Sequence, residues 1–338
     1  MPFLEELANE TLIHVLSYLQ LYDVVHGFFG LNQRFDWIIG SINLSIDLST
    51  TCPGLFDYCV RYITEFVEQV VYLKLCNTKF GSREVDLFNH TFCIDQFIQL
   101  RSLILMHTKD SDEVNILPKL DKLPFLTYFR VQTQNKKMKC YVKYLLSNKM
   151  TSLKTCIFDK YRVDSTDFSG ITVSNVEHLK ICLLLSQSEL LMLLRGLLPK
   201  IKTLHVNVRP SSIAAIDADI NGEHVPNLSS LTLESVEDMP PVFFETLIEK
   251  LFHIHRLRVL AYSISFLDGQ KWENISRKLP LLTHFELSVS LYKSRSNVWQ
   301  VKQRLAKFDK QFWNETGHRL HCCLEAFAKF NSCLTTPK

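Results

Sequence analysis

The most regular feature of the sequence is a six-residue pattern whose first, fourth and sixth positions are apolar while its third and fifth positions vary. Alternation over the last four positions is typical of a short strand that buries one face. The starts lie 23 to 30 residues apart, so the pattern predicts nine strands in a repeated unit. The clearest copies begin at Leu126, Leu153, Val176, Ile201, Leu228 and Leu282, and weaker copies begin at Val70, Leu100 and Leu257.

The stretches between these copies have the marks of helices. Ser186 and Glu189 form a capping box that opens one helix, and Asp238 and Asp268 are capping residues for two more. Prolines precede several strand copies, where a helix must stop. A strand followed by a helix, repeated many times, predicts an α/β fold with a parallel sheet. Because one unit cannot bury its own apolar face, the units must stack on one another.

Both ends of the chain depart from this pattern. Residues 1–40 predict three short helices: one from Ala8 to Leu19, one beginning near Asp23, and one capped by Asn32. Residues 41–49 alternate between apolar and polar, which predicts a strand leading into the first repeat. Residues 298–330 indicate a helical region that caps the last repeat.

Composition narrows the classes of function. The chain has 338 residues, 46% hydrophobic and 22% charged, and a net charge of +3 from 38 basic and 35 acidic residues. This small imbalance does not favour nucleic acid or membrane as a partner. The first ten residues carry three acids and no base, unlike a signal peptide. The ten cysteines form no C-x-x-C pair, which favours buried thiols in the reducing cytoplasm or nucleus.

The sequence contains none of the common catalytic or cofactor-binding motifs. No Gly-rich phosphate loop, nucleophile elbow or H-E-x-x-H motif occurs, so we expect no catalytic residues and no cofactor. On a helix, His318, His321 and Cys322 would share one face. Their spacing matches no standard zinc site and lacks a fourth ligand, so we expect no metal there.

The N-terminal helices resemble the F-box family. The family begins with a Leu-Pro-x-Glu step, and residues 7–10 read Leu-Ala-Asn-Glu, with Ala8 where the family has Pro. Residues 17–19, Ser-Tyr-Leu, match the end of the family's first helix, and Asp23 matches the next step. The most specific stretch is Leu31-Asn-Gln-Arg-Phe35, which resembles the family's third helix.

The repeats over roughly residues 60–290 resemble leucine-rich repeats, whose period is about 20–29 residues. The Asn or Cys common after each strand in that family is mostly absent here, and Asn77 and Asn207 are the nearest cases. The resemblance implies an F-box-like module at 1–40, a divergent leucine-rich-repeat solenoid at 41–295, and a helical cap and tail at 296–338. In such a solenoid, short parallel strands line the concave side and helices the convex side.

The two resemblances together imply a substrate-recognition subunit of a Skp–cullin–F-box ubiquitin ligase. The F-box would bind the Skp adaptor and, through it, the cullin, while the repeats would bind a target protein of unknown identity. Such a subunit is not an enzyme. One alternative is a scaffold whose N-terminal helices only cap the solenoid. Another is a divergent enzyme, but no group of residues in the sequence resembles a catalytic site. The resemblance places Skp-adaptor binding at six positions: Leu7, Leu12, Leu16, Leu19, Val24 and Phe35.

Target binding is expected on the variable strand positions, because these face away from the helices. Tyr and Arg are favoured anchors at protein interfaces. In the copy at Leu257, the third and fifth positions would be Val259 and Ala261. We predict a partner-binding patch with a basic tilt, formed by Tyr72, Lys74, Tyr128, Arg130, His178, Lys180 and His205.

Overall fold

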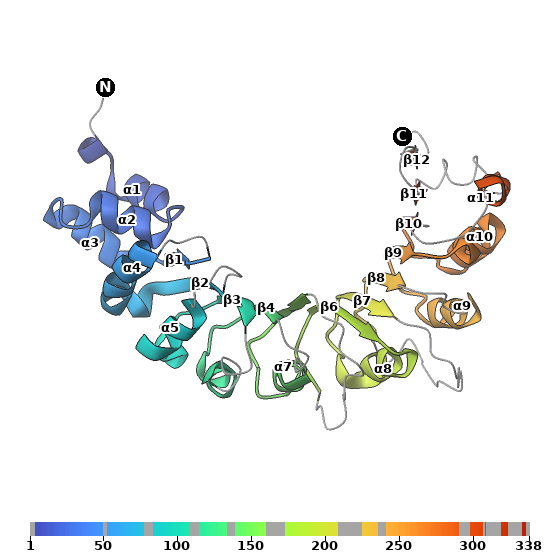
Figure 1. Cartoon of the computed structure of the whole chain (residues 1–338), viewed down its shortest axis with the longest axis horizontal. Helices are drawn as coiled ribbons and strands as arrows, with labels where there is room; N and C mark the ends of the chain where they lie inside the picture. Colours follow the sequence, from blue (N-terminus) through green and yellow to red (C-terminus); the bar gives the residue numbers. More distant parts are fainter. Residues whose placement is uncertain are drawn as a thin grey trace. The chain divides into compact units, whose positions relative to one another are not determined.

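The chain has an α/β fold built from parallel strands that alternate with helices (Figure 1). The structure is a computed structural model, and it divides into two compact units, residues 1–145 with 149–161 and residues 162–338 with 146–148. The residues that it describes are 4–49, 53–77, 84–108, 115–133, 139–159, 173–208, 225–235, 241–290, 298–306, 308, 319–323 and 333–335.

The first unit begins with helices and continues as strand–helix repeats. Its five strands pair in sequence order, each parallel to the next. Its elements are η1 Leu4–Glu6, α1 Asn9–Leu16, α2 Leu21–Phe28, α3 Gln33–Ser41, β1 Leu44–Asp47, α4 Pro53–Phe66, η2 Val67–Gln69, β2 Val70–Cys76, α5 Glu84–Thr91, η3 Ile94–Gln96, β3 Ser102–Thr108, η4 Leu117–Lys122, β4 Tyr128–Thr133, α7 Lys139–Leu145 and β5 Thr155–Asp159.

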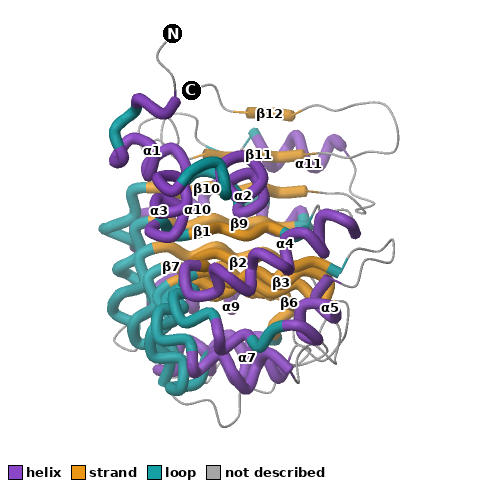
Figure 2. Tube along the Cα trace, turned by 90° about the vertical axis from the view of Figure 1, so that its left-hand side faces the viewer, coloured by secondary structure: helices purple, strands orange, loops and turns teal. Residues whose placement is uncertain are grey.

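The second unit repeats the same arrangement. Strands β6 to β11 pair in sequence order, and β12 joins β11 antiparallel. Figure 2 shows β9, β10 and β11 stacked as neighbouring strands. Its elements are β6 His178–Leu185, α8 Gln187–Met192, η5 Leu193–Leu197, β7 Thr203–Val208, β8 Ser230–Ser235, α9 Pro241–Lys250, β9 Arg256–Ala261, η7 Ile264–Phe266, α10 Gly269–Lys278, β10 His284–Ser290, α11 Val298–Leu305, β11 Arg319–Cys323 and β12 Cys333–Thr335.

Each unit has its own core between the sheet and its helices. The first, fourth and sixth positions of the repeated pattern point into this core; in the copy on β8 they are Leu228, Leu231 and Leu233, each at most 1% exposed. Within each unit the helices cover one face of the sheet, as α8, α9 and α10 do in the second unit (Figure 1). The opposite face, which we call the open face, carries the third and fifth positions.

The expected caps are present. Ser186 Oγ accepts a hydrogen bond from the Glu189 amide, and the Glu189 carboxylate accepts one from the Ser186 amide at 2.6 Å. Asp268 accepts a hydrogen bond from the Lys271 amide at the start of α10. Asn77, directly after β2, accepts a hydrogen bond from the Val85 amide at 3.0 Å and so fixes the first turn of α5. Asp238 lies outside the described residues.

The N-terminal region forms three helices, as predicted, with different bounds. Helix α1 ends at Leu16 rather than Leu19, and α2 begins at Leu21 rather than near Asp23. Between α2 and α3, Gly30 has a φ of +79°, a left-handed conformation that favours glycine. The expected strand after α3 is β1, which pairs with β2. Helix α4 was not predicted.

The C-terminal region corrects the prediction of a purely helical cap. Helix α11 is present, but residues 319–323 form strand β11, which extends the sheet beside β10. On a strand, successive side chains point to opposite faces, so His321 and Cys322 do not share the face that the helical interpretation required. His318 lies outside the described residues.

Three of the described cysteines, Cys59, Cys76 and Cys156, are buried, as expected for thiols in apolar runs. Burial raises the pKa of Cys59 to about 11, which keeps its thiol protonated and poorly reactive. Among the described helices, none has both the length and the apolar character needed to cross a bilayer.

Leu231→Ala is expected to destabilise the second unit by about 2–5 kcal/mol, because it leaves a cavity in the core between β8 and the helices. Its neighbour Thr232 lies on the open face, so Thr232→Ala should cost less than about 1 kcal/mol. Urea unfolding measures both. Equal destabilisation by the two changes would contradict the assignment of the two faces.

Candidate partner-binding surfaces

The structure places most of the six residues expected to bind the Skp adaptor inside the first unit. Leu12, Leu16, Val24 and Phe35 are each at most 1% exposed, because they are the contacts that hold α1, α2 and α3 together. Leu7 and Leu19 are half-buried. In this conformation the four buried side chains cannot contact a partner, so any binding surface here must use other residues.

The surface of these helices instead presents large apolar side chains. Tyr18 is 74% exposed, and Leu31 and Trp37 are each 61% exposed. Val15, one turn before Tyr18 on α1, is also exposed, and the His14 ring contacts Tyr18 edge-on at 5.1 Å. We call Val15, Tyr18, Leu31 and Trp37 the exposed helical set. These four side chains differ from the core residues of the same helices in being exposed. Sequence periodicity alone does not show which apolar side chains are exposed and which are buried.

The most F-box-like stretch, Leu31 to Phe35, has a clear structural role. The Arg34 guanidinium donates hydrogen bonds to the backbone carbonyls of Glu5 and Leu7 and, at 2.7 Å, to the side-chain oxygen of Asn9. Asn32 caps α3 by accepting a hydrogen bond from the Phe35 amide at 3.0 Å. Arg34 therefore fixes the N-terminal segment against α3.

On the open face of the first unit, the predicted residues fall into two rows. Strand register aligns Tyr72 with Ser102, Tyr128 and Thr155, and Lys74 with Ile104, Arg130 and Ile157. We call these the third-position and fifth-position rows. The sequence pattern predicted both rows, and pairing across β2 to β5 brings their members side by side.

Both predicted cations of the first unit have acidic partners. Lys74 Nζ lies 2.8 Å from Asp47 on β1, and Arg130 forms an ion pair with Asp159 on β5. Burial alone would raise the pKa of Asp47, but hydrogen bonds from Lys74 and Ser49 lower it below its ordinary value. The two aspartates therefore cancel the excess of positive charge expected on this part of the face. The other side chains of its two rows are tyrosine, isoleucine, serine and threonine.

In the second unit, register aligns His178 with Thr203, Ser230, Arg256 and His284. The fifth-position row aligns Lys180 with His205, Thr232, Arg258 and Glu286. His178, Lys180 and His205 are half-buried, and His178 Nδ1 lies 2.9 Å from the Thr203 hydroxyl. The three predicted residues of this unit thus lie together on β6 and β7.

The copy that was expected to begin at Leu257 begins three residues earlier, at Ile254. Val259 and Ala261, expected on the open face, are each 1% exposed and belong to the core. Arg256 and Arg258 take their places and are exposed. The sequence also allows this start, because the first, fourth and sixth positions would then be the apolar residues Ile254, Leu257 and Val259.

An acid sits at the centre of a polar network further along the same face. Tyr262 donates a hydrogen bond to Glu234 at 2.8 Å, and His205 Nε2 lies 3.9 Å from the other carboxylate oxygen. The proximity of His205 lowers the pKa of Glu234 against the opposing effect of burial, and the bond from Tyr262 lowers it further. Burial and the same hydrogen bond raise the pKa of Tyr262 to about 12.

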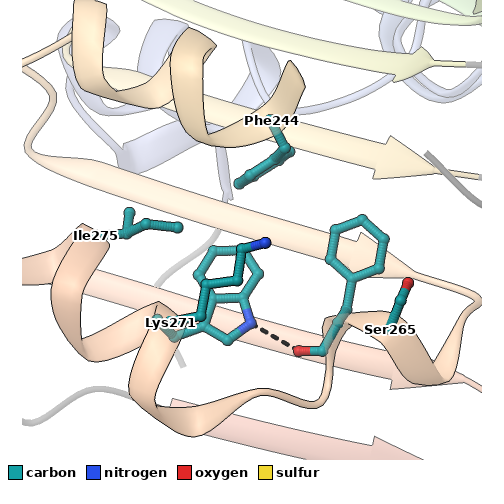
Figure 3. A pocket seen from close by; sticks show the side chains of 6 residues that line it. Phe244, Ser265, Lys271 and Ile275 are labelled. Atoms are coloured by element: carbon teal, nitrogen blue, oxygen red, sulfur yellow. Dashed lines mark hydrogen bonds between the residues drawn. The ribbon is translucent and has the colours of Figure 1, made fainter. Parts of the chain in front are cut away.

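A small pocket lies on the helix-covered side of the second unit, between α9 and α10 (Figure 3). Phe244 and Trp272 pack edge-to-face with ring centroids 5.3 Å apart, and the Trp272 indole donates to the Phe266 carbonyl at 2.7 Å. Lys271 at its edge forms an ion pair with Glu245. These mutual contacts make the pocket a part of the core packing rather than a ligand site.

Within the part of the chain that the structure describes, no group of three or more His, Cys, Asp or Glu side chains is placed to hold a metal ion. No protein-family model matches the chain, and no curated protein matches it significantly.

Glu234→Gln is expected to lower the free energy of unfolding near neutral pH, and the loss should shrink in acid. The folded-state pKa of Glu234 lies below its ordinary value of 4.5. Its carboxylate therefore stabilises the fold above pH 4.5, and this stabilisation is lost as pH falls through the folded-state pKa. Urea unfolding of both proteins across this range measures the difference. A difference that grows as pH falls would contradict the network.

Proposed function

We propose that this chain is a non-catalytic substrate receptor of a Skp–cullin–F-box-type ubiquitin ligase in the cytoplasm or nucleus. Its N-terminal helices act as an F-box-like module that binds the Skp adaptor and, through it, the cullin. Its strand–helix repeats act as divergent leucine-rich repeats that bind the target protein. Ubiquitin transfer is then accelerated by proximity, through subunits other than this chain.

The observation that carries the proposal is the exposed helical set. A helical cap for a repeat array needs apolar residues only where it meets the first repeat. Here Val15 on α1, Tyr18 in the turn after it, Leu31 in the turn before α3 and Trp37 on α3 are also exposed to solvent. Large aromatic side chains are the commonest anchors of protein interfaces. A dedicated partner for these helices accounts for this exposure, and the resemblance at Leu31 to Phe35 points to the Skp adaptor.

The repeats support the second half of the proposal. Among the described residues, no helix covers the open face of either unit, and its rows carry tyrosine, arginine, histidine and lysine together with Ile104 and Ile157. Loops and faces of repeat arrays supply extended binding surfaces.

The main alternative is a scaffold whose N-terminal helices only cap the repeats. One observation favours a capping role: Gln20 at the start of α2 forms a β-bridge with Ser45 of β1, and Leu44 is buried beside these helices. Covering the first strand protects its open edge. Capping and adaptor binding use different faces of the helices, so the two roles are compatible, and only the binding assay separates them.

The double variant Tyr18→Ala with Trp37→Ala should weaken Skp-adaptor binding by about thirtyfold or more, because truncating one aromatic hot-spot residue costs about 2 kcal/mol or more. Binding of the purified full chain to the purified Skp adaptor is measured by titration calorimetry. Both changes remove exposed side chains, so the folded state should remain as stable as the wild type.

The matched control is Trp299→Ala, which removes a tryptophan that is 63% exposed on α11, far along the sequence. It should leave the affinity unchanged. Failure of the full chain to bind the Skp adaptor would overturn the proposal. An equal loss with Trp299→Ala would show that the exposed helical set is not the binding surface.

A further inference from the structure

The open face of the second unit differs in chemistry from that of the first. Its third and fifth positions on β6 to β9 contain no acidic residue. They hold cations, imidazoles and hydroxyls: His178, Lys180, Thr203, His205, Ser230, Thr232, Arg256 and Arg258.

The equivalent positions of the first unit provide an internal comparison. Both of its cations, Lys74 and Arg130, are held by aspartates on neighbouring strands. The remaining positions are apolar, aromatic or hydroxyl-bearing. With flanking acids counted in both units, the first unit sets two cations against Asp47 and Asp159. The second sets Lys180, Arg256 and Arg258 against Glu234 and Glu286, which leaves an excess of one positive charge among more hydroxyls.

The cations of the second unit are available to an outside partner. Among the described residues, neither Lys180 nor Arg256 lies within ion-pair distance of an acid. Lys180 is near enough to Glu234 to contribute, after His205 and Tyr262, to the lowered pKa of that carboxyl. Arg258 pairs with Glu286 at 3.1 Å, but the Arg258 side chain is 50% exposed. An exposed pair of this kind is worth less than about 1 kcal/mol, so Arg258 can exchange its partner at little cost.

The spacing of the charges matches a short extended peptide. Lys180 on β6 and Arg256 on β9 are separated by three strand-to-strand steps and by two residues along the strands, or about 16 Å in all. An extended peptide that crosses the strands covers this distance in about five residues. The hydroxyls of Thr203, Ser230 and Thr232 lie between the two ends, where they can donate hydrogen bonds to carboxylates.

The acids that border this area argue against a continuous polyanion. Glu234 follows Thr232 on β8 by two residues and shares its face, and Glu286 lies on β10 next to Arg258. A nucleic acid strand carries a negative charge at every step and would meet both carboxylates. A peptide can place its acidic residues only where the cations are.

We infer that the open face of β6 to β9 binds a short Asp- and Glu-rich segment of the target protein, with Lys180 and Arg256 as the two anchoring cations. This inference rests on the proposed function, because it names the chemistry of the target that the repeats capture. Carboxylates of the target pair with the cations, and the row of hydroxyls between them completes the contact.

The test uses the full chain and two fluorescein-labelled peptides, Gly-Glu-Gln-Gln-Gln-Gln-Glu-Gly, whose two carboxylates lie five residues apart, and its counterpart with glutamine in place of both glutamates. Fluorescence anisotropy at low salt should show at least about tenfold tighter binding of the glutamate peptide. The double variant Lys180→Glu with Arg256→Glu should reduce that binding about tenfold or more, since like charges then face each other. Lys180→Gln with Arg256→Gln is a milder version that reverses no charge.

The matched control is Arg61→Glu with Lys278→Glu, which makes the same change in net charge at exposed positions on α4 and α10. It should bind the glutamate peptide within about twofold of the wild type. Equal binding of both peptides, an equal loss in the control, or tighter binding of a single-stranded oligonucleotide than of the glutamate peptide would each overturn the inference. Skp-adaptor binding is measured on the same variants. If the chain binds the Skp adaptor but does not prefer the glutamate peptide, this inference fails while the proposed function stands. If the chain does not bind the Skp adaptor, the proposed function itself fails.

Discussion

The constraint on which the structure depends is the unshifted pairing of consecutive parallel strands. Neighbouring strands that align residue for residue place the third-position residue of one strand beside the third-position residue of the next. Thr203, Ser230 and Arg256 are aligned in this way. Alternation then sends the first, fourth and sixth positions into the core and the third and fifth to the open face. A shift of one residue would expose the leucines and bury the cations, so the apolar core and the binding rows are specified together.

This constraint also explains why ion pairs on the open face form between strands rather than along one strand. Lys74 reaches Asp47 one strand before it, and Arg130 reaches Asp159 one strand after it. Each pair links side chains more than 25 residues apart in sequence but close across the ladder. Where the neighbouring strand offers a hydroxyl instead of an acid, as beside Arg256, the cation remains available. Lys74 and Asp47 face each other directly, whereas Arg130 reaches diagonally to Asp159, which is two residues beyond its own partner Ile157. The charge of the face therefore depends on which side chains the adjacent strands place within reach, and the composition of the chain does not show this.

Sequence reasoning predicted the repeated strands, the helices between them and the two rows, because all three follow from local apolar spacing. It misplaced the copy on β9 because Ile254 and Leu257 both fit the first position of the pattern. It missed β11, because a five-residue strand is stabilised by its pairing with β10, which the local pattern does not reveal. It assigned Leu12, Leu16, Val24 and Phe35 to a docking surface. An apolar helix face looks the same in sequence whether its own chain or a partner covers it, and only packing distinguishes the two.

If the chain is a substrate receptor, its N-terminal helices and its second-unit open face bind two different proteins. Photo-crosslinking in cells distinguishes the two surfaces, with the photoreactive residue p-benzoylphenylalanine placed at Trp37 in one version of the chain and at Thr232 in another. We expect the Trp37 position to crosslink to the Skp adaptor and the Thr232 position to crosslink to a different protein. Crosslinking of both positions to the same protein, or of the Thr232 position to the Skp adaptor, would contradict this expectation.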